Sequence, residues 1–377
     1  MRKLKYTTII LFLLLAHLTS CQQATKKETS APKSSLSYAK GFDLNYTNPD
    51  YTQVTVYNPW SPGDIYQTYY LVKDTTISTP QDGERILIPI QKLMTNSATH
   101  LSFLELLGLN DYIVGVCSAD YIYSPLIHNK ISKKEIVDLG DAFNLDIEQL
   151  LLLNPTAVMT SAYNAEDENS KRLRQSGLHI IYNIEWQEET LLGRAEWIKF
   201  VAAFFDKDTL AQEIFHDIEM KYNEVKNRVA KEITEKPSAL IGQDFRGTWS
   251  MPGGNSFNAQ LLRDAGIDYF YASNKDKGSL STTIEEALIY FNTADLWLNV
   301  QPSSLTELGS IDKRYKLFNA YKTGNVYNFN KRKNDRGGND YWELGVARPD
   351  LLLKDMIKIA HPQLLPNYEL TFMKKLN

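Results

Sequence analysis

The chain has 377 residues, of which 43% are hydrophobic, and this length favours two domains over one. Its net charge of −4 gives no reason to expect a nucleic-acid partner. With only two cysteines, the chain must be stabilised by apolar burial rather than by a disulfide framework.

The first 21 residues have the pattern of a signal peptide. A basic start is followed by an apolar run that closes on Leu18-Thr19-Ser20-Cys21. The run is shorter than the roughly 20 apolar residues of a membrane-spanning helix. Leu-Thr-Ser-Cys resembles the lipobox of bacterial lipoproteins, which implies lipidation of Cys21 and a membrane anchor that faces the periplasm or the cell surface. An ordinary secretory signal with an incidental cysteine is the alternative.

Two further segments precede the first regular lobe. Residues 22–36 are rich in Lys, Thr and Ser and predict a flexible tether. Residues 37–84, with YTQVTVYNPW and YYLVKD, predict a pair of strands whose role the sequence does not indicate.

The N-terminal lobe, residues 37–189, alternates short apolar runs with stretches of helical spacing. The runs at 85–90, 112–117, 156–162 and 179–184 predict buried strands, and the segments between them predict helices. Such alternation favours a parallel sheet covered on both faces. Cys117 closes the run YIVGVC and is therefore expected in the core.

Residues 190–236 predict two linking helices. On the second helix, apolar residues recur every three or four positions from Leu210 to Val229, without glycine or proline. This pattern predicts a stiff connection between the lobes.

The C-terminal lobe, residues 237–377, repeats the organisation of the first. Strands are expected at 238–245, 268–273, 294–300 and 325–330. Three segments echo the first lobe in the same order, since LELLGLNDY recurs as LLRDAGIDY, DIEQLLLLNPTAV as TIEEALIYFNTADL, and LRQSGLHIIYN as NAYKTGNVYNF. The sequence thus predicts an α/β protein with two Rossmann-like lobes, joined by a long rigid helix and enclosing a ligand cleft.

Aromatic and basic residues concentrate in the loops after the predicted strands, where open α/β sheets bind ligands. A bulky ligand would be gripped there by aromatic faces and by guanidinium groups bound to anionic oxygens. The candidates are His100, Tyr121, Tyr123, Tyr163, Arg246, Trp249, Arg336, Tyr341 and Trp342. Gly253-Gly254 and Gly337-Gly338 would let the backbone approach that ligand. Each tryptophan has core packing, and each arginine a solvated surface, as the competing interpretation.

Catalytic and metal motifs are missing from the sequence. It contains no G-x-S-x-G elbow, phosphate loop or H-E-x-x-H, and its six histidines are scattered. We therefore expect a binding protein with no catalytic residue, no protein-bound metal and no cofactor of its own.

RILIPIQKLMTNSATHLSFLELLGLNDYIVGV, DIEQLLLLNPTAV and GGNDYWE-x-G-x-x-R-P-D resemble the helical-backbone substrate-binding proteins of ABC importers for ferric siderophores, haem and vitamin B12. Ala98-Thr99-His100 and Thr156 depart from the family pattern. The resemblance implies a monomer that delivers a metal complex to a permease and its ATPase. It also implies that Glu148 and Glu285, one on each lobe, dock on the permease. First-turn acids favoured by the helix dipole are the alternative.

Two other classes stay open at this point. The same architecture serves chelatase-like enzymes, which would need a titratable cluster in the cleft. A surface scaffold lipoprotein would have no reason to place aromatics at strand ends of both lobes. Among ligands, an iron complex is favoured, with haem or cobalamin as the alternative.

Overall fold

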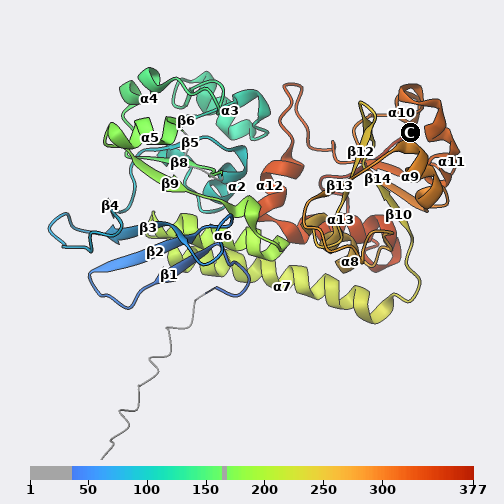
Figure 1. Cartoon of the computed structure of the whole chain (residues 1–377), viewed down its shortest axis with the longest axis horizontal. Coiled ribbons are helices and arrows are strands. Elements are labelled where there is room, and N and C mark those ends of the chain that lie inside the picture. Colours follow the sequence, from blue (N-terminus) through green and yellow to red (C-terminus); the bar gives the residue numbers. More distant parts are fainter. Residues whose placement is uncertain (1–35, 164–167) are drawn as a thin grey trace, which may run out of the picture. The chain divides into compact units, whose positions relative to one another are not determined.

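A four-stranded sheet begins the part of the chain that the computed structural model describes, residues 36–163 and 168–377 (Figure 1). Its strands are β1 (Phe42–Asn45), β2 (Tyr51–Tyr57), β3 (Ile65–Val72) and β4 (Glu84–Leu87). The prediction of a strand pair was incomplete, because β4 runs parallel to β3 and extends this sheet. Residues 85–90 therefore do not open the sheet of the N-terminal lobe, as the sequence had suggested.

The N-terminal lobe contains a five-stranded parallel sheet in the order β7-β6-β5-β8-β9. The strands are short and apolar because both faces are covered. They are β5 (Leu93–Thr95), β6 (Ile113–Val116), β7 (Val137–Asp138), β8 (Ala157–Thr160) and β9 (His179–Tyr182). The intervening helices are α2 (Ala98–Leu106), η1 (Asn110–Tyr112), η2 (Ala119–Tyr121), α3 (Pro125–Ser132), α4 (Ile147–Leu153), α5 (Glu168–Gln175) and η3 (Glu185–Gln187).

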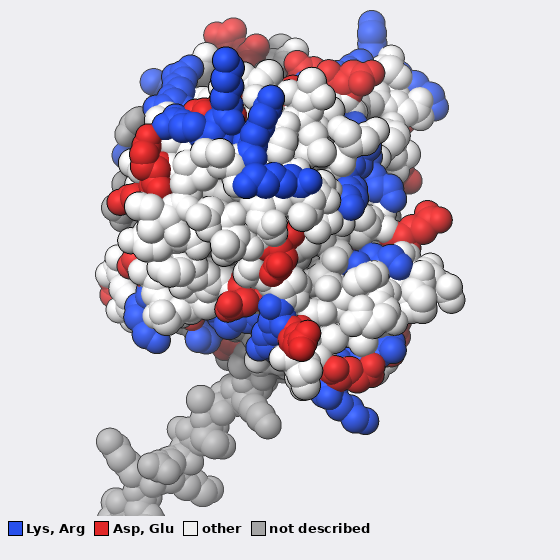
Figure 2. All heavy atoms as spheres, turned by 90° about the vertical axis from the view of Figure 1, so that its right-hand side faces the viewer, with Lys and Arg blue, Asp and Glu red and all other residues white. Residues whose placement is uncertain are grey.

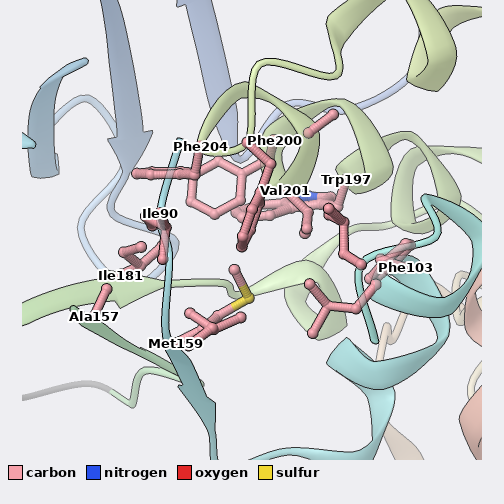
Figure 3. Close-up of a cluster of buried hydrophobic side chains, with 14 of the residues drawn as sticks. Ile90, Phe103, Ala157, Met159, Ile181, Trp197, Phe200, Val201 and Phe204 are labelled. Atoms are coloured by element: carbon pink, nitrogen blue, oxygen red, sulfur yellow. The ribbon is translucent and has the colours of Figure 1, made fainter. Parts of the chain in front are cut away.

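Helix α6 (Leu191–Ala203) lies between the two sheets and is buried along nearly its whole length. Figure 3 shows Trp197, Phe200 and Val201 of α6, with Phe204 just beyond it, facing Ala157, Met159 and Ile181 of the parallel sheet. On its other side, α6 meets the four-stranded sheet through ring contacts of Phe42 with Trp197 and of Tyr69 with Phe204. The N-terminal sheet is thus part of the lobe's hydrophobic core.

Helix α7 (Asp208–Glu232) is the long link that the apolar stripe predicted. Its first turns contribute Ala211 and Phe215 to the core of the N-terminal lobe. Its remaining turns contribute Ile218, Tyr222 and Val229 to the core of the C-terminal lobe. One uninterrupted helix therefore packs into both cores, and a stiff connection follows.

The C-terminal lobe combines two small sheets. One has the order β10-β14-β15-β16, with β10 (Ala239–Ile241), β14 (Leu296–Val300) and β15 (Val326–Asn328) parallel and β16 (Lys374–Lys375) antiparallel. The other is antiparallel and contains β11 (Asp244–Phe245), β12 (Thr248–Pro252) and β13 (Ser279–Thr282). The helices are α8 (Phe257–Asp264), α9 (Ile284–Phe291), α10 (Leu305–Ile311), η4 (Lys313–Leu317), α11 (Asn319–Lys322), α12 (Asp340–Ala347), α13 (Pro349–Ala360) and η5 (Pro362–Leu364).

The echoed segments occupy equivalent places in the two lobes. Helix α4 precedes β8 as α9 precedes β14, and α5 precedes β9 as α11 precedes β15. The echo of LELLGLNDY as LLRDAGIDY is weaker, because residues 268–273 form a turn in which only Asp268 bridges to Ser238. The predicted fold class, two α/β lobes with parallel sheets and a helical link, is confirmed; the strand at 268–273 was wrong. Among the described residues, no helix is both long and apolar enough to cross a membrane.

Candidate ligand site

A cavity of about 450 Å³ lies at the carboxyl ends of β5 and β8. Residues that follow both strands line it, together with α5 and the loop after β7. Its polar side chains are Asn96, Ser97, Thr160, Ser161 and Ser170. Its apolar and aromatic side chains are Ala98, Ala142, Phe143, Leu145, Val158, Tyr163 and Leu173. A concave, mostly apolar site with a few polar groups at this edge of a parallel sheet is the usual form of a ligand pocket.

Asn96 holds the two strand ends together at this cavity. Its amide nitrogen donates to Thr160 Oγ1 at 2.6 Å, and its amide oxygen accepts from the Ser161 N–H at 3.3 Å. The backbone N–H of Asn96 also donates to the Met159 carbonyl. The polar side of the cavity is therefore fixed in place before any ligand arrives.

An aromatic row (Phe143, Tyr163, Trp186, Trp60, Tyr66) runs from the cavity to the N-terminal sheet. Successive ring centroids along this row are 6.1, 6.0, 6.3 and 5.8 Å apart. Phe143, Tyr163 and Trp186 are 78, 47 and 38% exposed, so their faces are open to a ligand. The segment 37–84, for which the sequence suggested no role, supplies the last two rings, Trp60 from the loop between β2 and β3 and Tyr66 from β3.

Among the candidates predicted from sequence, Tyr163 lines this cavity, whereas three others lie in the interior. His100 is fully buried in α2, its ring within 3.1 Å of Thr95 Oγ1 and 3.2 Å of the Asn183 carbonyl oxygen. Because the first strand of the sheet is β5 rather than 85–90, His100 falls inside a helix and not in a strand-end loop. We correct the expectation that it faces a ligand.

Trp249 and Tyr341 are also interior. Trp249 is 0% exposed; it stacks on Trp297 and donates its indole N–H to the Ile241 carbonyl. Tyr341 is 4% exposed and packs on Phe329, and burial raises its pKa to about 12. For Trp249 the competing interpretation, core packing, describes where the side chain lies, and Tyr341 likewise lies in the core.

Trp342 is 47% exposed, unlike its neighbour Tyr341. It borders a crevice of only about 20 Å³ with Arg194 of α6 and Phe257 of α8. The guanidinium of Arg194 lies over the Phe257 ring, 4.8 Å from its centroid. This crevice has room for about one water molecule in the structure.

The loop 331–339, which we expected to contact a ligand, contacts the N-terminal lobe instead. Asn334 Nδ2 donates to the Ile122 carbonyl at 2.8 Å, and the Arg336 guanidinium lies 3.3 Å from His128 Nδ1. A Cβ at Gly338 would lie 2.2 Å from the Ile122 carbonyl oxygen. The absence of a side chain at Gly338 therefore allows close backbone packing between the lobes.

Tyr121 and Tyr123 belong to the same interlobe contact. Tyr121 is 71% exposed and its ring lies beside Gly337, while Tyr123 lies under the guanidinium of Arg332. The carboxylate of Glu343 accepts from the N–H groups of Tyr123 and Ser124, at 2.6 and 3.1 Å.

Arg246 lies apart from these residues. It occupies the tight turn between β11 and β12 with φ of 56° and is exposed over the ring of Phe245. Gly253 and Gly254 pack against the backbone of residues 271–278, so the approach they allow is to the protein's own loop.

The two predicted docking glutamates occupy equivalent first turns. Glu148 is exposed on α4, and Glu285 is exposed on α9, where its carboxylate pairs with Arg314 at 2.5 Å. Figure 2 shows lysine and arginine side chains gathered over the upper part of the face near α10 and α11. Exposed basic residues of η4 and α11 are Lys313, Arg314, Lys316 and Lys322.

The sequence predicted lipidation of Cys21 and core packing of Cys117, and the structure describes only the second of these residues. Cys21 lies outside the described residues, so its lipidation stays a prediction. Cys117 is 4% exposed, and burial raises the pKa of its thiol to about 12. An inert core cysteine, as the sequence suggested, fits this position.

The sequence did not indicate two of the aromatic residues at this site, Phe143 and Trp60. Phe143 follows β7, a two-residue strand too short to leave a periodic signal. Trp60 comes from the loop between β2 and β3, and only tertiary packing brings it beside Trp186.

These features have counterparts in known proteins. The chain belongs to the periplasmic binding protein family, whose model matches residues 94–332. An uncharacterized lipoprotein from Methanocaldococcus jannaschii is 23% identical over all of this chain and 97% of its own length.

Solved structures share the fold at low sequence identity. A possible iron-binding (periplasmic solute-binding) protein from Staphylococcus epidermidis is 18% identical, with a TM-score of 0.56 over 72% of this chain and 98% of its own. The periplasmic haem-binding protein HutB of Vibrio cholerae is 16% identical, with a TM-score of 0.55 over 70% of this chain and 98% of its own. The family match identifies the chain as a periplasmic binding protein rather than an enzyme, and the solved structures share its fold.

Proposed function

We propose that this protein captures an iron complex for an ABC importer, held on the membrane by a lipid at Cys21. The observation that carries the proposal is the cavity at the ends of β5 and β8, with Tyr163 and the aromatic row at its rim. Aromatic faces suit the apolar outer surface of a metal chelate. Structural relatives described as iron-binding and haem-binding proteins support a metal complex as the ligand.

Delivery requires a partner. A permease with its ATPase would receive the complex from a monomeric binding protein whose lobes present Glu148 and Glu285. The two glutamates occupy equivalent first turns, which supports a paired docking role. Capture involves little hinge motion, because α7 packs into both lobe cores.

A titration tests capture directly. A ferric siderophore, haem and cobalamin would each be titrated into the mature protein while tryptophan fluorescence is followed. We expect at least one to bind at micromolar concentration, and Tyr163→Ala to weaken it by roughly tenfold or more. Phe245→Ala is the matched control, because Phe245 is 72% exposed but lies at the end of β11, outside the cavity. Equal losses in the two variants would count against the cavity.

The lipid anchor needs its own experiment. Cys21→Ser should yield protein in the soluble fraction, whereas the wild type should carry acyl mass and sediment with membranes. Wild-type protein that washes freely off membranes without acyl mass would remove the anchor from the proposal.

A further inference from the structure

The chemistry of the cavity lining points to the charge of its ligand. The polar groups that line it are the amide of Asn96 and the hydroxyls of Ser97, Thr160, Ser161 and Ser170. The rest of the described lining is apolar or aromatic. This inventory supplies dipoles and ring faces, and every described lining side chain other than the weakly acidic phenol of Tyr163 is non-ionisable.

The cationic side chains of Arg174, Arg336 and Arg246 contact groups outside the cavity lining. On α5, Ser170 and Leu173 line the cavity, whereas the guanidinium of Arg174 donates to Glu84 at 3.1 Å. Arg336 and Arg246, the arginines expected to bind anions, lie beside His128 and over Phe245. In sequence, residues 164–169, which follow Tyr163, contain no lysine or arginine.

Charge decides which chelates such a lining accepts. A ferric tris-catecholate carries a net negative charge, and haem carries two propionates. Moving either from water to a site that offers only neutral dipoles costs solvation energy that no cation offsets. In a ferric tris-hydroxamate the three ligand charges cancel that of the iron, and cyanocobalamin is also neutral as a whole. Such complexes lose little on desolvation and keep amide and carbonyl groups that hydroxyls can bind.

We propose that this cavity selects a metal complex with no net charge. The inference rests on the proposed function and names the class of substrate for the same site. The rings of Phe143, Tyr163 and Trp186 contact the apolar surface of the complex. The hydroxyls of Ser97 and Ser161 donate to its carbonyl oxygens.

A comparison of four probes tests the charge rule, that is, the proposal that the cavity selects a complex with no net charge. Ferrichrome, cyanocobalamin, ferric enterobactin and haemin would be titrated separately into the full mature protein at one ionic strength. We expect one of the neutral pair to bind at least roughly tenfold more tightly than either anion. Ferrichrome and cyanocobalamin distinguish the two sources of a neutral complex. Tighter binding of ferric enterobactin or haemin would overturn the charge rule while leaving the proposed function intact. Binding of none of the four would reject both.

A charge-introducing variant gives a second, independent measurement. Ser161→Lys places a cation at the cavity wall and should raise the affinity for ferric enterobactin by roughly tenfold or more, without raising that for ferrichrome. Ser132→Lys, at an exposed position on α3, is the control for added surface charge. A Ser161→Lys protein with unchanged preference, and with the wild-type circular dichroism spectrum, would show that charge at this cavity does not select the ligand.

Discussion

The carboxylate of Glu196 accepts a hydrogen bond from the backbone N–H of Tyr38 at 2.7 Å, and it also accepts from the N–H groups of Ser37 and Ala39. Glu188, in the loop just before α6, accepts from the N–H groups of Lys40 and Gly41 in the same way. Two buried acids thus fix residues 37–41, where the fold begins.

Loss of the Glu196 carboxylate should release this segment. Glu196→Ala removes acceptors from three successive amides, and we expect a loss of at least about 2 kcal/mol in the free energy of unfolding. Hydrogen exchange at residues 37–39 should accelerate. Urea unfolding and exchange mass spectrometry measure the two effects.

Glu189→Ala is the control, because Glu189 is 44% exposed and forms only surface ion pairs with Lys40 and Lys277. Its cost should stay within about 1 kcal/mol. Amides 37–39 that keep their protection in Glu196→Ala would show that other contacts hold the segment.

The contact of Glu343 with the N-terminal lobe should make stability depend on pH. Burial, with Asp340 and Glu105 nearby, raises the Glu343 pKa to about 7, although the N–H groups of Tyr123 and Ser124 oppose the shift. A raised native pKa adds stability fully present below the ordinary value of 4.5 and lost as pH rises through about 7. The wild type should therefore lose up to about 3 kcal/mol relative to Glu343→Gln between pH 4.5 and 8.

Urea unfolding of both proteins across this range isolates the group, because other titrations cancel in the difference. Glu148→Gln, at an exposed position on α4, is the control and should parallel the wild type. A flat difference between wild type and Glu343→Gln would mean that Glu343 titrates normally.

Neighbouring aromatic residues of α12 should respond differently to truncation. Tyr341→Ala should cost about 3 kcal/mol or more, because Tyr341 is 4% exposed and packs on Phe329. Trp342→Ala should cost less than about 2 kcal/mol, since Trp342 is 47% exposed. Chemical denaturation measures both. Equal costs would indicate that Trp342 is as much a core residue as Tyr341.

Docking on the permease should depend on Glu148 and Glu285, one on each lobe, and not on the residues of the cavity. Glu148→Ala with Glu285→Ala should abolish most permease-stimulated ATPase activity while ligand affinity changes by less than about twofold. The measurement uses the permease and ATPase reconstituted in proteoliposomes.

Glu213→Ala with Glu224→Ala is the matched double control, since both residues are exposed on α7. Normal ATPase stimulation by the variant with Glu148→Ala and Glu285→Ala would contradict the docking proposal. Equal losses in both double variants would point to a general effect of surface charge.

The sequence predicted the fold where periodicity was strong. Runs such as 156–162 and 179–184 are apolar at Ala157–Met159 and Ile180–Tyr182 because β8 and β9 are covered on both faces, and the stripe on α7 reflects packing into two cores. Prediction failed where elements are short. The strand β5 has three residues, so the longer run 85–90 was mistaken for it, and the error moved His100 into a loop.

The candidate site was harder to predict than the fold. The sequence predicts both Trp249 and Tyr163 in loops that follow strands. Only the tertiary structure shows that Trp249 packs against Trp297 whereas Tyr163 lines a cavity. Likewise Gly338 signals close backbone approach, but the sequence does not say to what; the structure places Ile122 there. Whether such a residue lies in the core or at the cavity depends on contacts between residues far apart in the chain.

The sharing of α7 between the lobes also has a consequence for cooperativity. Cutting the chain between the lobes would strip Phe215 or Tyr222 of the side chains that cover it, and neither half would keep a closed apolar interior. Heating should therefore melt both halves in a single calorimetric transition. In evolutionary terms, the two lobes would have to change together, because neither can be exchanged as a self-sufficient module.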